Sequence, residues 1–132
     1  MCSWVFNQIK NEMFSAEKNS GAYFNNQRIR VSKKRNLNEC LFATGGKDEI
    51  KNNLNTRKSG SAALDMAYVG AGRYDGYFQK NLNIWDIAAG IIIVNEAGGE
   101  VNDMDCFSNK LINIFGGSNS IYEKMIRNLN NF

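Results

Sequence analysis

Residues 85–99 read WDIAAGIIIVNEAGG and place a single carboxylate in front of an apolar run. No further charge follows Asp86 until Glu96, which predicts a helix over residues 87–97 whose apolar run lies in the core. We expect Asp86 to be the N-cap of this helix and Gly98 to be the left-handed residue that ends it. The carboxylate either caps the helix, which stabilises it by about 1 kcal/mol, or holds a metal ion. The local pattern favours capping, and metal binding by Asp86 remains the alternative.

A second helix is predicted to begin after Ser61, where small and apolar residues recur at helical intervals and the serine is a natural cap. Both predicted helices follow glycine-containing segments. In a parallel α/β layer such helix starts gather at the carboxyl ends of strands, and their free N–H groups favour an anion such as phosphate. Asp86 at the same edge could pair that anion with Mg²⁺. The alternative is plain capping at Asp86 and close helix packing at residues 60–63.

The remaining segments predict strands and one more helix. Alternating residues around asparagine turns predict two hairpins, and short apolar runs between glycines predict further strands. The predicted strands cover residues 3–7, 12–17, 21–24, 27–32, 40–44, 72–79, 99–103 and 111–117, and a closing helix covers 121–129. The predicted fold class is α/β, with antiparallel hairpins followed by a mainly parallel sheet with helices.

Composition limits the classes of protein that the chain can represent. Its 132 residues, 43% hydrophobic and 22% charged, suit a single domain over residues 1–132. A net charge of +3 and the short cluster at residues 33–35 do not favour nucleic-acid binding. No apolar run is long enough for a bilayer and no secretory signal is visible, so we expect a cytoplasmic protein without a membrane anchor. The absence of histidine excludes Ser-His and Cys-His nucleophiles and imidazole-bound zinc.

The motif at residues 85–99 resembles the C-terminal signature of the inositol monophosphatase family, in its bacterial extragenic-suppressor branch. Residues 11–32, NEMFSAEKNSGAYFNNQRIRVS, and 57–78, RKSGSAALDMAYVGAGRYDGYF, resemble the family's two hairpins and the segment before the signature. The resemblance covers nearly all of this chain but only the C-terminal half of a family member. It implies a layered α/β/α fold and a Mg²⁺-dependent phosphomonoesterase, usually dimeric, that acts on inositol monophosphate or a related sugar phosphate.

The resemblance also implies roles for individual residues. Asp86 would ligate a catalytic magnesium and touch the substrate, and Gly60, Ser61 and Ala62 would hold the inositol side. Gln79 stands where many members have a glutamate that accepts hydrogen bonds from substrate hydroxyls, so the charge-assisted component is lost here. Residues 46–57 are shorter than the family pattern, which implies that a helix there is missing or reduced.

In the family, the other metal ligands come from an upstream glutamate and from an Asp-Pro-(Ile/Leu)-Asp-Gly-Thr segment. This chain contains no proline, so it lacks that segment in its usual form. Asp65 and Asp75 lie nearby in sequence, but no pattern obliges either to face Asp86. One carboxylate is too few for metal-assisted hydrolysis, so we expect the chain alone to be inactive. Activity would then need an N-terminal half, and that half or a homodimer would cover exposed strand edges. The alternative is a non-catalytic remnant or interaction module of the same fold.

Overall fold

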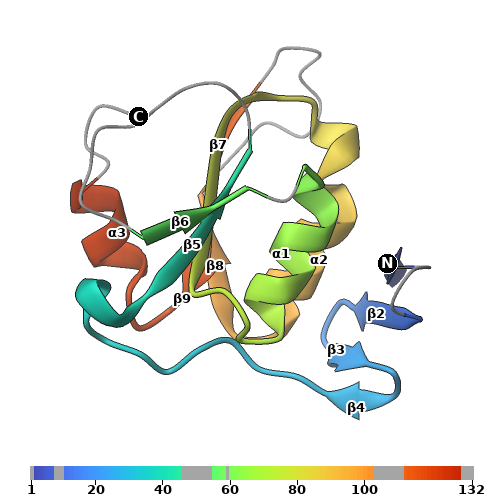
Figure 1. Ribbon diagram of the computed structural model, residues 1–132. Helices are drawn as coiled ribbons and strands as arrows, with labels where there is room; N and C mark the ends of the chain where they lie inside the picture. Colours follow the sequence, from blue (N-terminus) through green and yellow to red (C-terminus); the bar gives the residue numbers. More distant parts are fainter. Residues whose placement is uncertain (1, 8–10, 46–54, 59, 103–111, 129–132) are drawn as a thin grey trace.

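The computed structural model describes residues 2–7, 11–45, 55–58, 60–102 and 112–128 (Figure 1). Two sheets and three α-helices make up the described part of the chain. Along the chain the elements are β1 (Cys2–Asn7), β2 (Glu12–Glu17), β3 (Gly21–Phe24), β4 (Gln27–Arg28), the 3₁₀ helix η1 (Leu37–Glu39), β5 (Leu41–Thr44), β6 (Asn55–Arg57), α1 (Ala62–Gly70), β7 (Gly76–Leu82), the 3₁₀ helix η2 (Ile84–Asp86), α2 (Ala88–Glu96), β8 (Gly99–Val101), β9 (Ile112–Ser118) and α3 (Tyr122–Asn128).

The first sheet is an antiparallel meander in the order β1-β2-β3-β4, which confirms both predicted hairpins. Asn25 and Asn26 join β3 to β4 with φ values of 45° and 70°. Two consecutive left-handed residues form the type of tight turn that matches the twist of the flanking strands. β4 ends at Arg28, so the strand predicted over residues 27–32 is shorter than expected. Beyond it the chain leaves the sheet, and the Val31 N–H donates to the Ala97 carbonyl, 3.0 Å away.

The second sheet has the order β6-β5-β7-β9-β8 and is mixed. β5 runs parallel to β6 and β7, whereas β9 is antiparallel to β7 and β8. The α/β class is confirmed, but the sheet is parallel only in its β6-β5-β7 part, so the prediction of a mainly parallel sheet is wrong for β8 and β9. The reason is connection length: fewer than a dozen residues separate β8 from β9, and a parallel crossover needs about that many or more.

Helices cover both faces of the mixed sheet (Figure 1). α1 and α2 lie side by side on one face and α3 lies on the other, while the antiparallel sheet packs against the outer side of α1 and α2. The core accordingly has three parts. Phe14, Ala22 and Tyr68 lie between the antiparallel sheet and the helices. Met66, Tyr77 and Val94 lie between α1, α2 and the mixed sheet. Phe42, Phe78 and Met125 lie between the mixed sheet and α3.

Small residues allow α1 and α2 to approach closely. A Cβ added at Gly90 would lie 2.7 Å from the Met66 Cβ, and one at Gly70 would lie 2.8 Å from the Ile93 Cγ2. Such distances exclude any larger residue unless the helices separate. The close approach of the two helices is therefore at Gly70 and Gly90. The close packing considered for residues 60–63 is not found at Gly60, where an added Cβ would have no heavy atom within 4 Å.

Sequence-based boundaries differ from the structure at several elements. β7 begins at Gly76, because residues 72–75 form the turn after α1, and it continues to Leu82. β6 and η1 were not predicted, since neither has alternating apolar residues. Residues 46–54, where a family helix was expected to be reduced, lie outside the described residues. No helix in the described part of the chain is long and apolar enough to span a membrane.

Candidate substrate pocket

A pocket of about 430 Å³ opens where α1, β7 and η2 meet near the end of β5. It is lined by Gly45, Gly60, Ser61, Ala62, Ala63, Asp65, Gln79, Leu82 and Asp86. The structure thus brings together every residue that the sequence singled out, although those residues span positions 60–86. Because β5 and β7 are parallel, their carboxyl ends meet at this edge, as expected for a ligand site in an α/β sheet.

The start of α1 forms one wall of the pocket. Ser61 has an extended backbone, and its Oγ accepts a hydrogen bond from the Leu64 N–H at 3.3 Å, which confirms the predicted cap. Gly60 precedes it with φ +88°, a conformation that L side chains rarely adopt. The turn therefore needs glycine for its backbone, and Ser61, Ala62 and Ala63 at the start of this nine-residue helix line the pocket.

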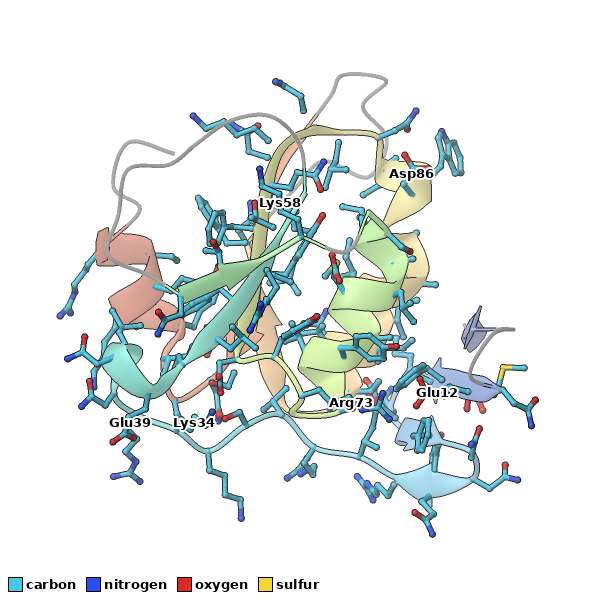
Figure 2. All side chains as sticks on the ribbon, viewed as in Figure 1. Glu12, Lys34, Glu39, Lys58, Arg73 and Asp86 are labelled. Carbon is cyan, nitrogen blue, oxygen red and sulfur yellow. The ribbon has the colours of Figure 1, made fainter. Side chains whose placement is uncertain are left out.

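Asp86 forms the opposite wall and does not cap α2. It is the last residue of η2, whose cap is Asn83, and Ile87 takes the N-cap position of α2 without a side-chain hydrogen bond. The prediction that Asp86 is the N-cap is therefore wrong, because the chain makes a 3₁₀ turn before the helix begins. Asp86 is exposed and forms no ion pair with any described residue (Figure 2), so its carboxylate remains available to a ligand.

Asp65 is a pocket residue that the sequence did not identify. It is 1% exposed, lies in the first turn of α1, and its N–H donates to the Ser61 carbonyl at 2.9 Å. The four-residue spacing from Ser61 places both residues on one helix face, and this spacing is the signal that could have found it. The pocket therefore contains a buried carboxylate as well as the exposed one of Asp86.

Gln79 lies on β7, on the same side of the strand as Tyr77. The Tyr77 hydroxyl donates a hydrogen bond to Gln79 Oε1. Gly45 packs against the same amide, because a Cβ added there would lie 3.0 Å from Gln79 Cδ. Burial, with a smaller contribution from the Asp65 charge, raises the pKa of Tyr77, so its hydroxyl stays protonated.

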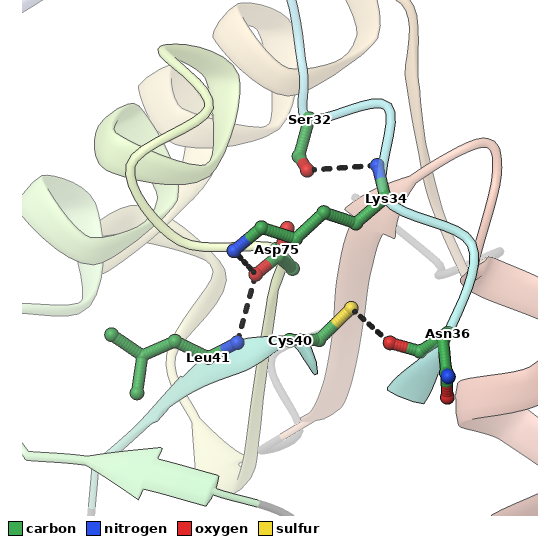
Figure 3. A network of polar contacts seen from close by, with 6 residues as sticks. All are labelled: Ser32, Lys34, Asn36, Cys40, Leu41 and Asp75. Atoms are coloured by element: carbon green, nitrogen blue, oxygen red, sulfur yellow. Dashed lines mark hydrogen bonds and ion pairs between the residues drawn. The ribbon is translucent and has the colours of Figure 1, made fainter. Parts of the chain in front are cut away.

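Asp75 lies away from the pocket and has a structural role (Figure 3). Its buried Oδ2 accepts a hydrogen bond from the Leu41 N–H at 2.8 Å and pairs with Lys34 Nζ at 3.4 Å. These contacts hold residues 29–36 against the start of β5.

Beside them, burial and the Asp75 charge raise the pKa of the Cys40 thiol to about 11, and the thiol donates to the Asn36 carbonyl. Cys40 is therefore an unreactive buried thiol.

The pocket offers hard oxygen ligands of the kind that Mg²⁺ prefers, the carboxylates of Asp65 and Asp86. Within the described ranges, however, no group of three or more potential metal-ligating side chains comes together. The donor set fits magnesium in kind but supplies only part of a coordination shell.

Comparison with known proteins agrees with the fold. A model of the inositol monophosphatase family matches residues 1–130. The chain is 50% identical over 114 residues to a Thermotoga maritima fructose-1,6-bisphosphatase/inositol-1-monophosphatase, covering 80% of this chain and 43% of that protein. It is 37% identical to the Escherichia coli Nus factor SuhB, covering 95% and 53%. The crystal structure of the extragenic suppressor protein suhB from Bartonella henselae superposes with a TM-score of 0.86 at 42% identity, covering 98% of this chain and 56% of that one.

The layered arrangement of helices and sheets defines a mixed α/β protein, and the chain belongs to the inositol monophosphatase family. It spans about half the length of the curated relatives that it matches.

Proposed function

We propose that the chain supplies the substrate-binding wall of a magnesium-dependent phosphomonoesterase that hydrolyses inositol monophosphate or a related sugar phosphate. The observation that supports this proposal most is that Gly60, Ser61, Ala62, Gln79 and Asp86 line one pocket while Asp86 has no ion-pair partner among the described residues. A fructose bisphosphate is a second substrate to test, since the relative from Thermotoga maritima carries both activities in its name.

Each pocket residue then has a task that follows from its position. Asp86 holds the metal, and the N–H groups at the start of α1 hold the inositol or sugar side of the substrate together with the Ser61 hydroxyl. Gln79 contacts the part of the substrate beyond the phosphate, and Ala62 leaves room for it. Magnesium, when bound, polarises the phosphate and lowers the pKa of its bound water.

In this proposal the chain alone is inactive, because Asp65 and Asp86 cannot complete a site that activates water and stabilises the leaving oxygen. The remaining ligands come from the part of a family member that this chain does not match, and a second copy or that part covers the free edges of the sheets. A cytoplasmic location is part of the same proposal. Nucleic acid is not a proposed ligand, because the net charge is only +3.

The test is a chimera in which the unmatched part of the Thermotoga maritima relative is fused to this chain. We expect phosphate release from inositol 1-phosphate that requires Mg²⁺ and falls at least about a hundredfold in Asp86→Asn. Glu100→Gln, an exposed carboxylate on β8, is the matched control and should retain activity. A correctly folded chimera without magnesium-dependent turnover would overturn the proposal.

A non-catalytic module of the same fold is the second candidate function. It is favoured by the finding that no group of three or more metal-ligating side chains occurs in the described part of the chain. This candidate predicts no turnover in the chimera and no response of the chain to phosphate esters. Turnover in the chimera would rule it out.

A further inference from the structure

The two ends of the Gln79 amide face different surroundings. Its Oε1 accepts a hydrogen bond from Tyr77, a fully buried residue of the core between the helices and the mixed sheet. Gln79 itself is half-buried and lines the pocket. The amide oxygen is therefore used by the protein, whereas the amide nitrogen is not.

Tyr77 and Gly45 both contact the amide of Gln79. The Tyr77 hydroxyl stays protonated in its buried position, so it is able to donate the hydrogen bond that Gln79 Oε1 accepts. Gly45 packs against the amide, with room for no side chain. Nε2 has no hydrogen-bond acceptor among the described residues, and it is not one of the buried polar atoms that lack a partner. Its two N–H groups are therefore accessible from the pocket.

We propose that Gln79, oriented by Tyr77, donates a hydrogen bond to the substrate, so that the pocket accepts a phosphate ester bearing a neutral acceptor-only oxygen at this position. An ether or keto oxygen has this chemistry. A substrate hydroxyl also fits, because its oxygen can accept a hydrogen bond from the Gln79 amide. A glutamate at this position would accept hydrogen bonds from hydroxyls but would repel the oxygen of an ether or a ketone. The inference rests on the proposed function, since it concerns the part of the ester beyond the phosphate.

Charge in the pocket favours a neutral acceptor over a second anion. The buried carboxylate of Asp65 lines the same pocket, and its charge adds to the effect of burial in raising the pKa of Tyr77. A carboxylate or second phosphate next to Gln79 would meet this negative charge at low dielectric. A neutral oxygen gains the hydrogen bond without that repulsion.

The orientation of the amide can be tested without any ligand. In the ¹H–¹⁵N spectrum of the full chain, the side-chain NH₂ signals of Gln79 are assigned by their loss in Gln79→Glu. We expect nuclear Overhauser contacts from these protons to pocket residues such as Ala62, and exchange with water. Strong contacts to the Tyr77 ring protons, with slow exchange, would show the nitrogen facing Tyr77 and would overturn the inference.

Ligand preference is tested with glucose 6-phosphate and methyl α-glucopyranoside 6-phosphate, titrated into the chain with Mg²⁺ and followed by chemical shifts. The two esters differ at a position remote from the phosphate, where a hydroxyl is replaced by a methyl ether. We expect Gln79→Glu to weaken the methyl glycoside relative to glucose 6-phosphate by about tenfold compared with the wild type. Taking the ratio cancels the added bulk of the methyl group. Gln27→Glu, the same change at an exposed residue of β4, should leave the ratio unchanged.

Tyr77→Phe separates orientation from packing, because it keeps the buried ring and removes the donor. The freed amide can turn its oxygen to the pocket, so the methyl glycoside should lose affinity relative to glucose 6-phosphate. In the Gln79→Glu background the same change should have little further effect on the ratio. An equal effect of Tyr77→Phe in both backgrounds would contradict a positioning role.

The outcomes distinguish this inference from the proposed function. If neither ester moves the signals of Ser61 and Asp86, the proposed function and the inference both fail. If both esters move those signals but Gln79→Glu leaves their ratio unchanged, only the inference fails.

Discussion

In the part of the chain that the structure describes, asparagine is the non-glycine residue found at left-handed backbone positions. Among the described residues, those with positive φ other than glycine are Asn11, Asn19, Asn25, Asn26 and Asn81. Asparagine tolerates this region better than other L residues, because its short polar side chain can bond to the local backbone. Asn25 does so, since its Oδ1 accepts from the Met13 N–H at 2.9 Å. All of these positions except Asn81, which lies on β7 of the mixed sheet, are in connections of the antiparallel sheet.

Asn26 offers a direct test of backbone conformation, because it is exposed and has φ 70°. Asn26→Ala should lower the free energy of unfolding by about 1 kcal/mol, because the left-handed backbone conformation is unfavourable for alanine. Asn26→Gly should change it by only a few tenths of a kcal/mol in either direction. Urea denaturation of the three proteins measures both effects. Equal stability of the alanine and glycine variants would show that the turn relaxes to another conformation.

The residues of the candidate pocket could be predicted from the sequence better than their local conformations. Gly60, Ser61 and Asp86 were identified from motifs, and the structure places them together. The cap at Asp86 was wrong because the 3₁₀ turn at η2 depends on Asn83, which no helical pattern marks. Asp65 was named but not assigned to the site, because no local pattern obliges it to face Asp86 and its burial is set by tertiary packing.

At the scale of elements, the end of the signature helix is joined to the β2–β3 turn by Glu96. Its Oε1 accepts from the Gly21 N–H at 3.0 Å, and the N–H groups of Asn19 and Ser20 add to the effect. These backbone hydrogen bonds, helped by the Arg28 charge, lower the pKa of Glu96 below its usual value. The two acids of the signature thus differ: Asp86 faces the pocket, and Glu96 holds a hairpin against α2.

The lowered pKa of Glu96 predicts a pH dependence of stability. The ionised carboxylate stabilises the fold fully above the unfolded pKa, and this contribution is lost as the pH falls through the lower folded pKa. At neutral pH, Glu96→Gln should therefore lower the free energy of unfolding by about 1 kcal/mol. The difference from the wild type should shrink in acid. Urea denaturation at neutral and acidic pH measures it, with Glu100→Gln as the control, and a difference that persists undiminished in acid would contradict the assignment.

Arg73 joins the antiparallel sheet to the end of α1 (Figure 2). Its Nη2 lies 2.6 Å from Glu12 Oε2, and its guanidinium carbon lies 4.8 Å from the centre of the Tyr68 ring and 5.0 Å from that of Phe24. Glu12 is 8% exposed and also accepts from the Tyr68 hydroxyl. The hydrogen bond to Glu12 is the main cause that raises the pKa of Arg73.

Substitutions at Arg73 should separate charge from planar geometry. Arg73→Lys keeps the charge but loses the ring stacking, and should cost about 1 kcal/mol of stability. Arg73→Met leaves the carboxylate of Glu12 without its cation, and should cost about 3 kcal/mol. Chemical denaturation ranks the variants, and restoration by Glu12→Gln in the methionine background would confirm the cause. A lysine variant as unstable as the methionine variant would show that packing dominates.

The arrangement of elements was predictable where local pattern decides it. Hairpins and helices follow from turn residues and periodicity, so β2, β3, α1 and α2 were found near their observed bounds. The direction of β9 was not predictable in this way, because it depends on which neighbour the strand finds after a short connection. β6 was not predicted because its residues, Asn, Thr and Arg, are all exposed and show no apolar alternation that indicates a strand.

At the scale of the whole molecule, the signature residues 85–99 connect the pocket to the opposite end of the fold. α2 packs against α1 and the antiparallel sheet, with η2 at the pocket end and Glu96 at the hairpin end. The position of Asp86 is therefore determined by a rigid helix between two sheets. The described residues contain no group of three or more metal-ligating side chains. The assignment of Asp86 as a metal ligand is therefore best tested by measuring how tightly the chain binds the metal.

We expect Mg²⁺ to bind the chain weakly and through Asp86, because magnesium gives up water reluctantly and Asp65 is the other carboxylate that lines the pocket. At a concentration equal to its Kd, the ion should raise the free energy of unfolding by about 0.4 kcal/mol, which corresponds to roughly 1–2 °C in Tm for a chain of this size. Thermal unfolding in MgCl₂ and in NaCl of equal ionic strength measures this difference. Asp86→Asn should abolish it and Glu100→Gln should retain it, because the latter carboxylate is exposed on β8. A shift that survives in Asp86→Asn would place the ion elsewhere and remove the basis for a metal role of this residue.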